Sequence, residues 1–146
     1  MQTAITTEDV DRAPTGRQQP PKVRLSSGTG EGPTALAAFD AALLDAGVAH
    51  QDRRRWAVMS QMRQARPGRQ AHACLGWVQQ DAHEHGLFVP LHDDERDRLE
   101  HDLQAALASM RGRNGDSGRV HTAFASRQCT ANPVCALVVA VYGDEP

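Results

Sequence analysis

The stretch Val134–Tyr142 (VCALVVAVY) decides the architecture of this chain. Almost every residue in it is apolar, valine predominates, and no charged side chain interrupts it. A continuous apolar run with this β-branched composition is typical of a strand that is covered on both faces. We therefore expect Val134–Tyr142 to be a central strand and the rest of the chain to pack around it.

The chain before this run contains further strand patterns, separated by turn residues. Alternation of apolar and polar side chains, or short apolar runs, predicts each of them. Arg66-Pro67-Gly68 marks a turn between two of them, and Pro90 is expected to interrupt the third middle strand. The predicted strands are Lys22–Ser27, Trp56–Met62 (with Trp56, Val58, Ser60 and Met62 on one face), Ala71–Gln79, Gly86–Leu91 and Val120–Ala125.

A glycine-rich stretch and a helix follow the first predicted strand. Gly28–Gly32 is interpreted as a tight loop, and Pro33 and Thr34 open a helix that runs to about Ala46, with Gly47 just past its end. Helical spacing places one set of apolar residues on the face toward the core. This set is Leu36, Phe39, Leu43 and Ala46.

A second, longer helix is predicted in the second half of the chain. Asp93 and Asp94 can cap it, and it continues to about Met110 before a polar loop at Arg113–Gly118. Its expected buried stripe is Leu99, Leu103, Leu107 and Met110.

The order of these elements predicts an α+β fold, in which a mixed β-sheet is packed by two helices as a sandwich. Residues 1–20 are polar and contain breakers of any regular pattern, so we expect a flexible N-terminal tail. Residues 21–146 are then a single domain, large enough to bury a core.

Composition narrows the possible functions. Hydrophobic residues make up 40% and aromatics 4% of the chain, so Leu, Val and Ala must build the core. The net charge of -2 argues against nucleic acid or an anionic membrane as a partner. No apolar run reaches membrane-spanning length and no signal core is present, so a cytoplasmic location is expected. Cys74 and Cys135 lie in apolar runs, and Cys129 leaves an odd number without C-x-x-C spacing, which indicates free thiols.

Three stretches carry a family signature. They are Ser27–Gly32 followed by Leu36–Gly47, Leu75–Gln79 followed by Gly86–Val89, and Pro133–Tyr142. In this order they resemble the first glycine loop and helix, the middle strands and the final strand of the pyruvoyl-dependent arginine decarboxylases. Together they cover most of residues 21–142.

The resemblance implies a four-layer αββα sandwich and a trimer or dimer of trimers, with substrate bound between subunits. It also implies a lyase of polyamine metabolism that converts arginine to agmatine and carbon dioxide. Loss of the carboxylate needs an electron sink on the amino nitrogen. The family makes this sink from its own chain: cleavage between two serines leaves an N-terminal pyruvoyl group, whose ketone forms a Schiff base with the substrate.

The chain departs from this pattern at two places. It passes from Gly47–His50 directly to Gln51–Trp56, and the residues from Trp56 onward already resemble the strand beyond the family's processing site. The segment with the serine pair is therefore expected to be missing. Pro90 stands where the family has its catalytic Glu. We expect no pyruvoyl group, no other cofactor and no catalytic residue in this chain.

Part of a substrate pocket matches the family. The resemblance implies that Asp40 faces a guanidinium and that Leu43 is an apolar contact one turn further on, so these are the predicted substrate-binding residues for an arginine- or agmatine-like molecule. A carboxylate can pair with a guanidinium through two hydrogen bonds. The alternative for Asp40 is a solvated position on the helix.

Several sequence motifs resemble processing, cofactor-binding, phosphate-binding or metal sites. Ser26-Ser27 looks like a processing pair, but it precedes the glycine stretch, and we predict that it is not cleaved. Lys22 is the only lysine, and no phosphate-binding motif accompanies it as pyridoxal phosphate would require. Gly28–Gly32 lacks the lysine of a phosphate loop. The histidines of the middle region are interpreted as surface residues rather than metal ligands: His83, His85, His92 and His101.

Three functions stay open. The chain is a family member that has lost self-processing, alone as a homotrimer or in a mixed oligomer with an intact homologue. Alternatively, it is a working decarboxylase in which another residue supplies the carbonyl. In the third possibility, it is a binding or accessory protein for a guanidino or amine metabolite. A missing central segment should expose apolar edges, which predicts poor solubility or a tight oligomer.

Overall fold

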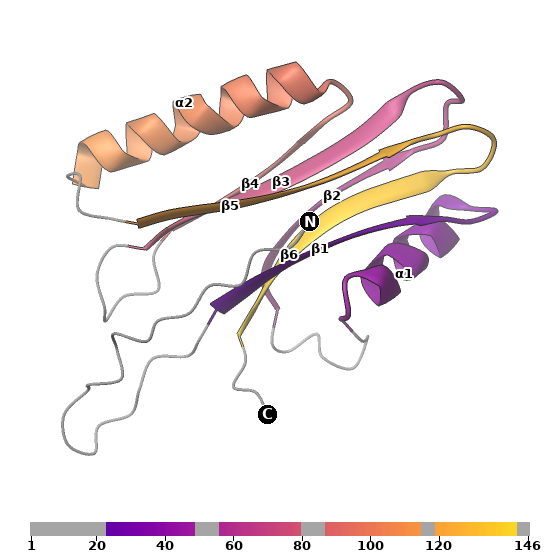
Figure 1. The fold of residues 1–146 in the computed structure, drawn as a ribbon, viewed down its shortest axis with the longest axis horizontal. Helices are drawn as coiled ribbons and strands as arrows, with labels where there is room; N and C mark the ends of the chain where they lie inside the picture. The colour runs from indigo at the N-terminus through magenta and orange to yellow at the C-terminus, as the bar shows by residue number, and fades with distance from the viewer. Residues whose placement is uncertain (1–22, 49–55, 80–86, 115–118, 143–146) are drawn as a thin grey trace, which may run out of the picture.

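The computed structural model describes residues 23–48, 56–79, 87–114 and 119–142, and these ranges form two stacked sheets between two helices (Figure 1). One helix covers the outer face of each sheet, so the α+β sandwich with αββα layers is confirmed. The predicted tail at residues 1–20 lies outside the described ranges. In chain order the elements are β1 (Val23–Glu31), α1 (Ala35–Asp45), β2 (Trp56–Gln64), β3 (Gln70–Gln79), β4 (Leu87–Asp93), α2 (Arg96–Asn114), β5 (Arg119–Gln128) and β6 (Val134–Tyr142).

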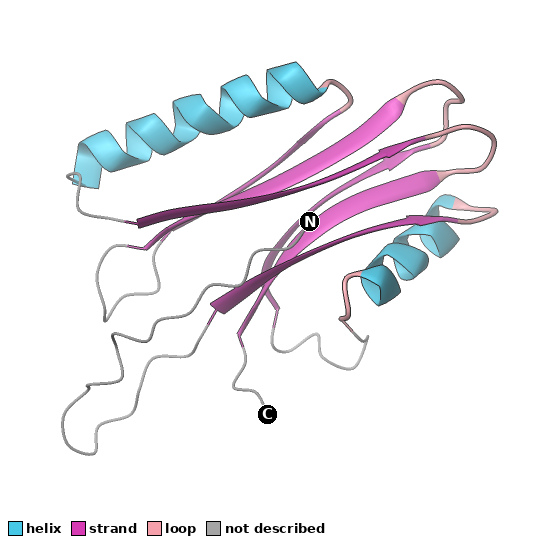
Figure 2. Ribbon diagram, viewed as in Figure 1, coloured by secondary structure: helices cyan, strands magenta, loops and turns pink. Residues whose placement is uncertain are grey.

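Each sheet has three strands, in the orders β1-β6-β2 and β4-β3-β5 (Figure 2). Every pairing is antiparallel, so the predicted mixed sheet is wrong. The reason lies in the crossovers. Helix α1 connects β1 to β2, but β6 from the end of the chain inserts between them, and β3 likewise separates β4 from β5 across α2. Strands that would be parallel neighbours are thus kept apart by one antiparallel strand.

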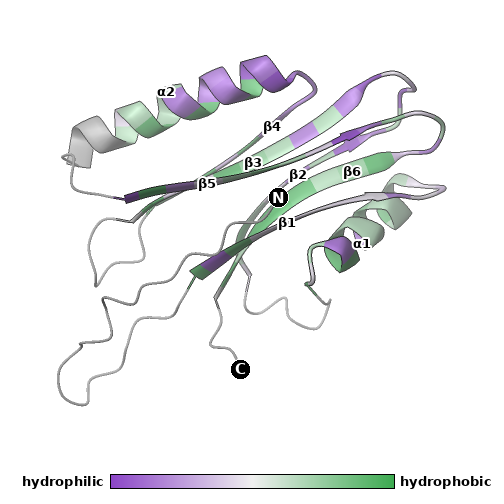
Figure 3. Ribbon diagram, in the orientation of Figure 1, coloured by the Kyte–Doolittle hydropathy of each residue, from purple (hydrophilic) through white to green (hydrophobic). Residues whose placement is uncertain are grey.

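Strand β6 is central, as its composition predicts, and it is the most continuously apolar strand of its sheet (Figure 3). Its alternate residues enter two different clusters. One row faces the second sheet and the other faces α1, so both faces are buried. The rows are Val134, Ala136, Val138 and Ala140 toward the second sheet, and Cys135, Leu137, Val139 and Val141 toward α1.

The glycine stretch is not a loop, which corrects the prediction, because β1 continues to Glu31. Gly28 and Gly30 face α1 at very short range. A Cβ atom at Gly28 would lie 2.4 Å from the Ala42 carbonyl oxygen, and one at Gly30 would lie 2.4 Å from the Ala42 nitrogen. These glycines therefore make room for a helix that packs directly on the strand backbone.

Helix α1 begins after Thr34, whose hydroxyl accepts a hydrogen bond from the Ala37 N–H at 3.0 Å. Gly47 follows its end at φ 77°, as predicted. Its buried face consists of Ala38, Ala42 and Leu43. Leu36 is 66% exposed, so its predicted burial is wrong. The close approach to the β1 glycines selects small side chains for the contact and turns Leu36 outward.

Helix α2 buries the predicted leucine stripe against the second sheet. Leu99, Leu103 and Leu107 are buried and Met110 is partly buried. Asp93 caps the entry to the helix by accepting a hydrogen bond from the Glu95 N–H at 2.9 Å. Within the described ranges, neither helix combines the length and apolarity needed to cross a membrane.

Two local predictions in the strands need correction. A bulge between Trp56 and Val58 places Trp56 on the α1 side of its sheet, while Val58 and Met62 face the other sheet. Pro90 does not interrupt β4, which continues to Asp93. Because β4 is an edge strand, a missing N–H at Pro90 costs no ladder hydrogen bond that the sheet needs.

Candidate functional site

The two edge strands β1 and β5 lie against each other across the sandwich and border a cavity of about 600 Å³. Both strands are paired on one side only. The cavity therefore lies at the open edge of the sandwich, where side chains from both sheets and both helices converge. Its lining consists of Ser27–Thr29 of β1, Asp45 at the end of α1, Arg96 at the start of α2 and Thr122–Ser126 of β5.

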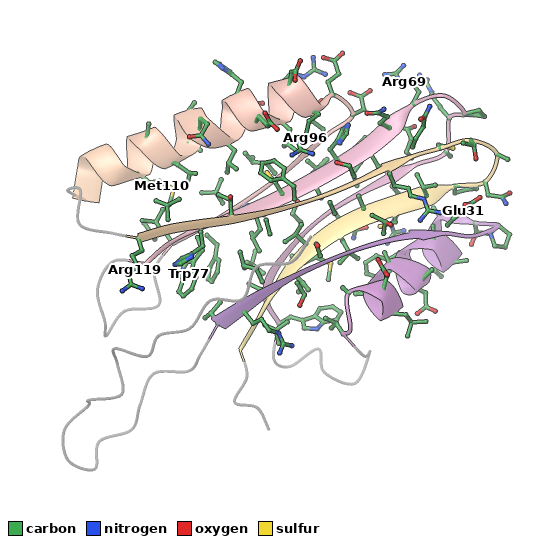
Figure 4. All side chains as sticks on the ribbon, in the orientation of Figure 1. Glu31, Arg69, Trp77, Arg96, Met110 and Arg119 are labelled. Carbon is green, nitrogen blue, oxygen red and sulfur yellow. The ribbon has the colours of Figure 1, made fainter. Side chains whose placement is uncertain are left out.

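Asp45 and Arg96 place opposite charges in this lining. The Asp45 carboxylate accepts a hydrogen bond from the Thr29 N–H at 2.9 Å, which caps the outer edge of β1. The Arg96 guanidinium lies over the Phe124 ring, with its carbon 4.3 Å from the ring centroid, and extends from α2 toward β5 (Figure 4). The cavity can therefore offer an acceptor for a cation and a donor for an anion.

Arg127 connects the two edge strands beside the cavity. Its guanidinium donates to Thr29 Oγ1 at 3.2 Å and to Glu31 at 3.1 Å. The Arg127–Glu31 pair is partly exposed and contributes little net stability by itself. Its role is positional, because it keeps β5 next to β1 where the cavity begins.

His72 of β3 lies behind the cavity wall and is 4% exposed. Its Nδ1 lies 2.7 Å from Ser126 Oγ, and its Nε2 lies 2.8 Å from Gln70 Oε1. Burial and the nearby charge of Arg96 lower the pKa of His72, and they outweigh Asp93 and Asp94, which raise it. The imidazole is therefore neutral at pH 7.

This shift predicts how stability depends on pH. Because the pKa of His72 is lower in the folded than in the unfolded chain, its contribution is fully present above the unfolded value of about 6.5. The free energy of unfolding should fall as the pH decreases below that value toward the folded pKa. Urea unfolding between pH 5 and 8 checks this. His72→Gln should flatten the dependence, and an equally steep profile in this variant would contradict it.

The predicted substrate residues lie elsewhere on α1. Leu43 is completely buried against the first sheet, and Asp40 is half-buried one turn earlier. Neither lines the cavity, whose α1 residue is Asp45.

Sequence reasoning missed Asp45, Arg96, His72 and Ser126 because four different elements bring them together. One feature of the sequence could have indicated Asp45. A carboxylate in the last turn of a helix is disfavoured by the helix dipole, and Asp45 is the final residue of α1.

Ser26, Ser27 and Ser60 all lie in paired strands. The Ser26–Ser27 bond lies inside β1, where the two residues pair with Val139 and Val138 of β6. Ser60 donates its hydroxyl proton to the Leu91 carbonyl at 2.5 Å, which joins the two sheets. Cleavage next to any of these residues would cut a paired strand.

No group of three potential metal ligands occurs within the part of the chain that the structure describes. His92 and His101 are exposed, and His83 and His85 lie outside that part. The three cysteines, Cys74, Cys129 and Cys135, are all buried as free thiols, as their sequence context predicts for Cys74 and Cys135. Burial raises the pKa values of Cys74 and Cys135 to about 11, so neither is a ready nucleophile.

Comparison with known proteins bears on the same ranges. No curated protein matches the chain. A family model described as pyruvoyl-dependent arginine decarboxylase (PvlArgDC) matches residues 53–146, from just before β2 to beyond β6. The match includes the whole second sheet with α2 and the central strand of the first sheet. Since it extends over more than half of the residues, the chain belongs to the pyruvoyl-dependent arginine decarboxylase family.

Proposed function

We propose that this chain is a family member that forms no pyruvoyl group, does not decarboxylate arginine and has kept the scaffold to bind a small molecule with an amine or guanidine group. Decarboxylation needs an electron sink bonded to the substrate nitrogen. The observation that carries the proposal is the placement of Ser26-Ser27 inside β1, where both residues pair with β6. The family resemblance adds the expectation that the separate processing segment is missing.

Pro90 supports the same proposal. The family resemblance places a catalytic Glu at this position, and proline has no group that can donate a proton. In the fold, Pro90 lies in the edge strand β4, opposite Leu75 of β3. Position 90 is therefore still part of the sheet, but proline gives it no titratable side chain.

The edge cavity supports retained binding. Its volume of about 600 Å³ is in the range of small-molecule sites. Asp45 offers a carboxylate, which can pair with an ammonium or guanidinium group. Asp40 keeps its proposed role from the family resemblance, so two carboxylates of α1 are candidates for the cation.

The first test measures activity. Purified protein incubated with radiolabelled arginine is expected to release no carbon dioxide above the blank, and intact mass spectrometry should show one uncut chain. Two fragments that meet at Ser27, or agmatine formed by unsplit protein, would overturn the loss of activity.

The second test measures binding by calorimetry with agmatine. Asp45→Asn should weaken binding by about 10-fold or more, because a hydrogen bond to a charged group contributes about 1.5–3 kcal/mol. Asp40→Asn is the matched variant, five residues earlier on the same helix. Loss of binding in that variant alone would assign the site to Asp40, and absence of heat from the unmodified protein would refute retained binding.

A non-catalytic subunit in an oligomer is a second candidate function. Leu36 and Leu44 are 66% and 69% exposed and lie eight residues apart on the outer side of α1. We propose that this surface is an assembly interface, in a homotrimer or in a mixed oligomer with an intact homologue. Light scattering should therefore show an assembly, and a monodisperse monomer would count against it.

A further inference from the structure

A chain of hydrogen bonds runs from Gln70, exposed at the start of β3, through the buried His72 to Ser126 at the edge cavity. Ser126 of β5 and His72 of β3 are direct cross-strand partners, and Ser126 Oγ lies 2.7 Å from His72 Nδ1. The other ring nitrogen, Nε2, lies 2.8 Å from the side-chain oxygen of Gln70. Ser126 is exposed and lines the cavity, while His72 is buried behind it.

The partners determine which atom carries each proton. The Gln70 oxygen can only accept, so His72 Nε2 carries the hydrogen and donates it. In the neutral ring, Nδ1 is then the acceptor, and it receives the hydroxyl proton of Ser126. The serine oxygen is thus hydrogen-bonded to a base that another residue orients, which is the arrangement that activates a hydroxyl nucleophile.

Arg96 provides positive charge at the same oxygen. Its Nη1 donates to Ser126 Oγ at 3.2 Å, and its Nε donates to Glu100 at 2.7 Å. The Phe124 ring beneath the guanidinium holds it in place. A cation next to the reacting oxygen stabilises negative charge that develops there or on a carbonyl oxygen bound beside it.

We propose that Ser126 is an acyl-accepting nucleophile, with His72 as its general base, for small carboxylic esters that enter the edge cavity. The proposal stands independently of the amine-binding function. The edge cavity would bind the ester next to Ser126. The Asp45 carboxylate in its lining favours esters that are neutral or carry an amine.

The reaction needs no cofactor. Ser126 Oγ forms a bond to the ester carbonyl carbon while its proton moves to His72 Nδ1, and the carbonyl electrons become an oxyanion beside Arg96. When the oxyanion collapses, the carbon–oxygen bond to the alcohol breaks, and the alcohol leaves with the proton from His72. Water then attacks the acyl-serine with His72 again as the base, releasing the acid and restoring Ser126.

The surroundings of His72 suit this role. The charged groups that act on His72 are the guanidinium of Arg96 and the carboxylates of Asp93 and Asp94. Burial is the largest cause of its lowered pKa, so the base form is present at pH 7 and is lost only in more acidic solution. The rate should therefore rise with pH through the folded pKa of His72 and then reach a plateau.

The test uses the full-length protein and p-nitrophenyl acetate. We expect p-nitrophenol release to fall by at least about 100-fold in Ser126→Ala and in His72→Gln, the magnitude of general base catalysis. Ser109→Ala, at an exposed position on α2, is the matched control and should keep the full rate. Peptide mapping after rapid acid quenching should locate one acetyl group on Ser126.

Gln70 acts as a positioning residue and has a separate readout. Gln70→Glu places a carboxylate next to Nε2, which should raise the pKa of His72 and move the midpoint of the pH–rate profile upward by about one unit. Thermal melts establish that each variant is folded. An acetyl group on another residue, or a rate in Ser126→Ala equal to that of the unmodified protein, would overturn the proposal.

Discussion

Replacing Gly30 by alanine is expected to destabilise the protein by about 3 kcal/mol, at the upper end of ordinary overpacking costs. The added Cβ would lie 2.4 Å from the Ala42 nitrogen and 2.5 Å from the Ala38 carbonyl oxygen. Both atoms belong to the backbone of α1, so no rotamer change can relieve the contact. The helix must move away from β1, and the cluster beneath it loses packing.

The matched control for this change is Gly76→Ala. Gly76 also lies in a strand beneath a helix, but its added Cβ would contact the ends of the Leu103 and Leu107 side chains at 3.1 and 3.2 Å. Flexible methyl groups can shift by a few tenths of an ångström, so we expect a cost below about 1 kcal/mol. Urea unfolding of both variants measures the difference. Equal costs would show that α1 is not held against β1 by these glycines.

Replacing Leu103 by alanine is the second large change and should cost about 2–5 kcal/mol, the range for buried leucines. Leu103 is 0% exposed and lies at the middle of the stripe that joins α2 to β3. Truncation leaves a cavity next to Gly76, which has no side chain to fill it. Because α2 carries Arg96, loosening this helix should also weaken the ester hydrolysis proposed for Ser126.

Leu36→Ala provides the control for this truncation. The chemical change is the same, but Leu36 is 66% exposed on α1, so the cost should stay within about 0.5 kcal/mol. Thermal unfolding of both variants gives the comparison. A large loss of stability on truncating Leu36 would mean that α1 is covered in solution, which would support the oligomer proposed above.

Most elements of the fold could be predicted from local patterns. Val134–Tyr142 has the bounds and the central place expected from its composition, and the leucine stripe of α2 is buried as its spacing predicts. The wrong predictions occurred where a contact between distant elements overrides the local pattern. Gly28 and Gly30 are typical of a loop when read alone, but they belong to a strand because a helix lies on them.

The candidate site could be predicted far less well. Asp40 and Leu43 are predicted from their match to a family pattern, and both lie on one helix that periodicity can describe. Asp45, Arg96 and Ser126 share a cavity only because β1 and β5 meet at the edge of the sandwich. No local sequence pattern can predict that β1 and β5 lie side by side. The two strands are almost a hundred residues apart in the chain, and each pairs with a different strand.

The amino-acid sequence by itself determined the type and order of the strands and helices and the buried leucine row of α2, because these depend on the 2.0 and 3.6 residue periods of the backbone. The absence of the family's serine-pair segment stays a prediction from the family resemblance. Tertiary structure alone decided that β6 and β3 insert between crossover-connected strands, and so which strands form the edges. That choice depends on burying both faces of the most apolar strands at once, a free energy that exists only when the two sheets and both helices pack together.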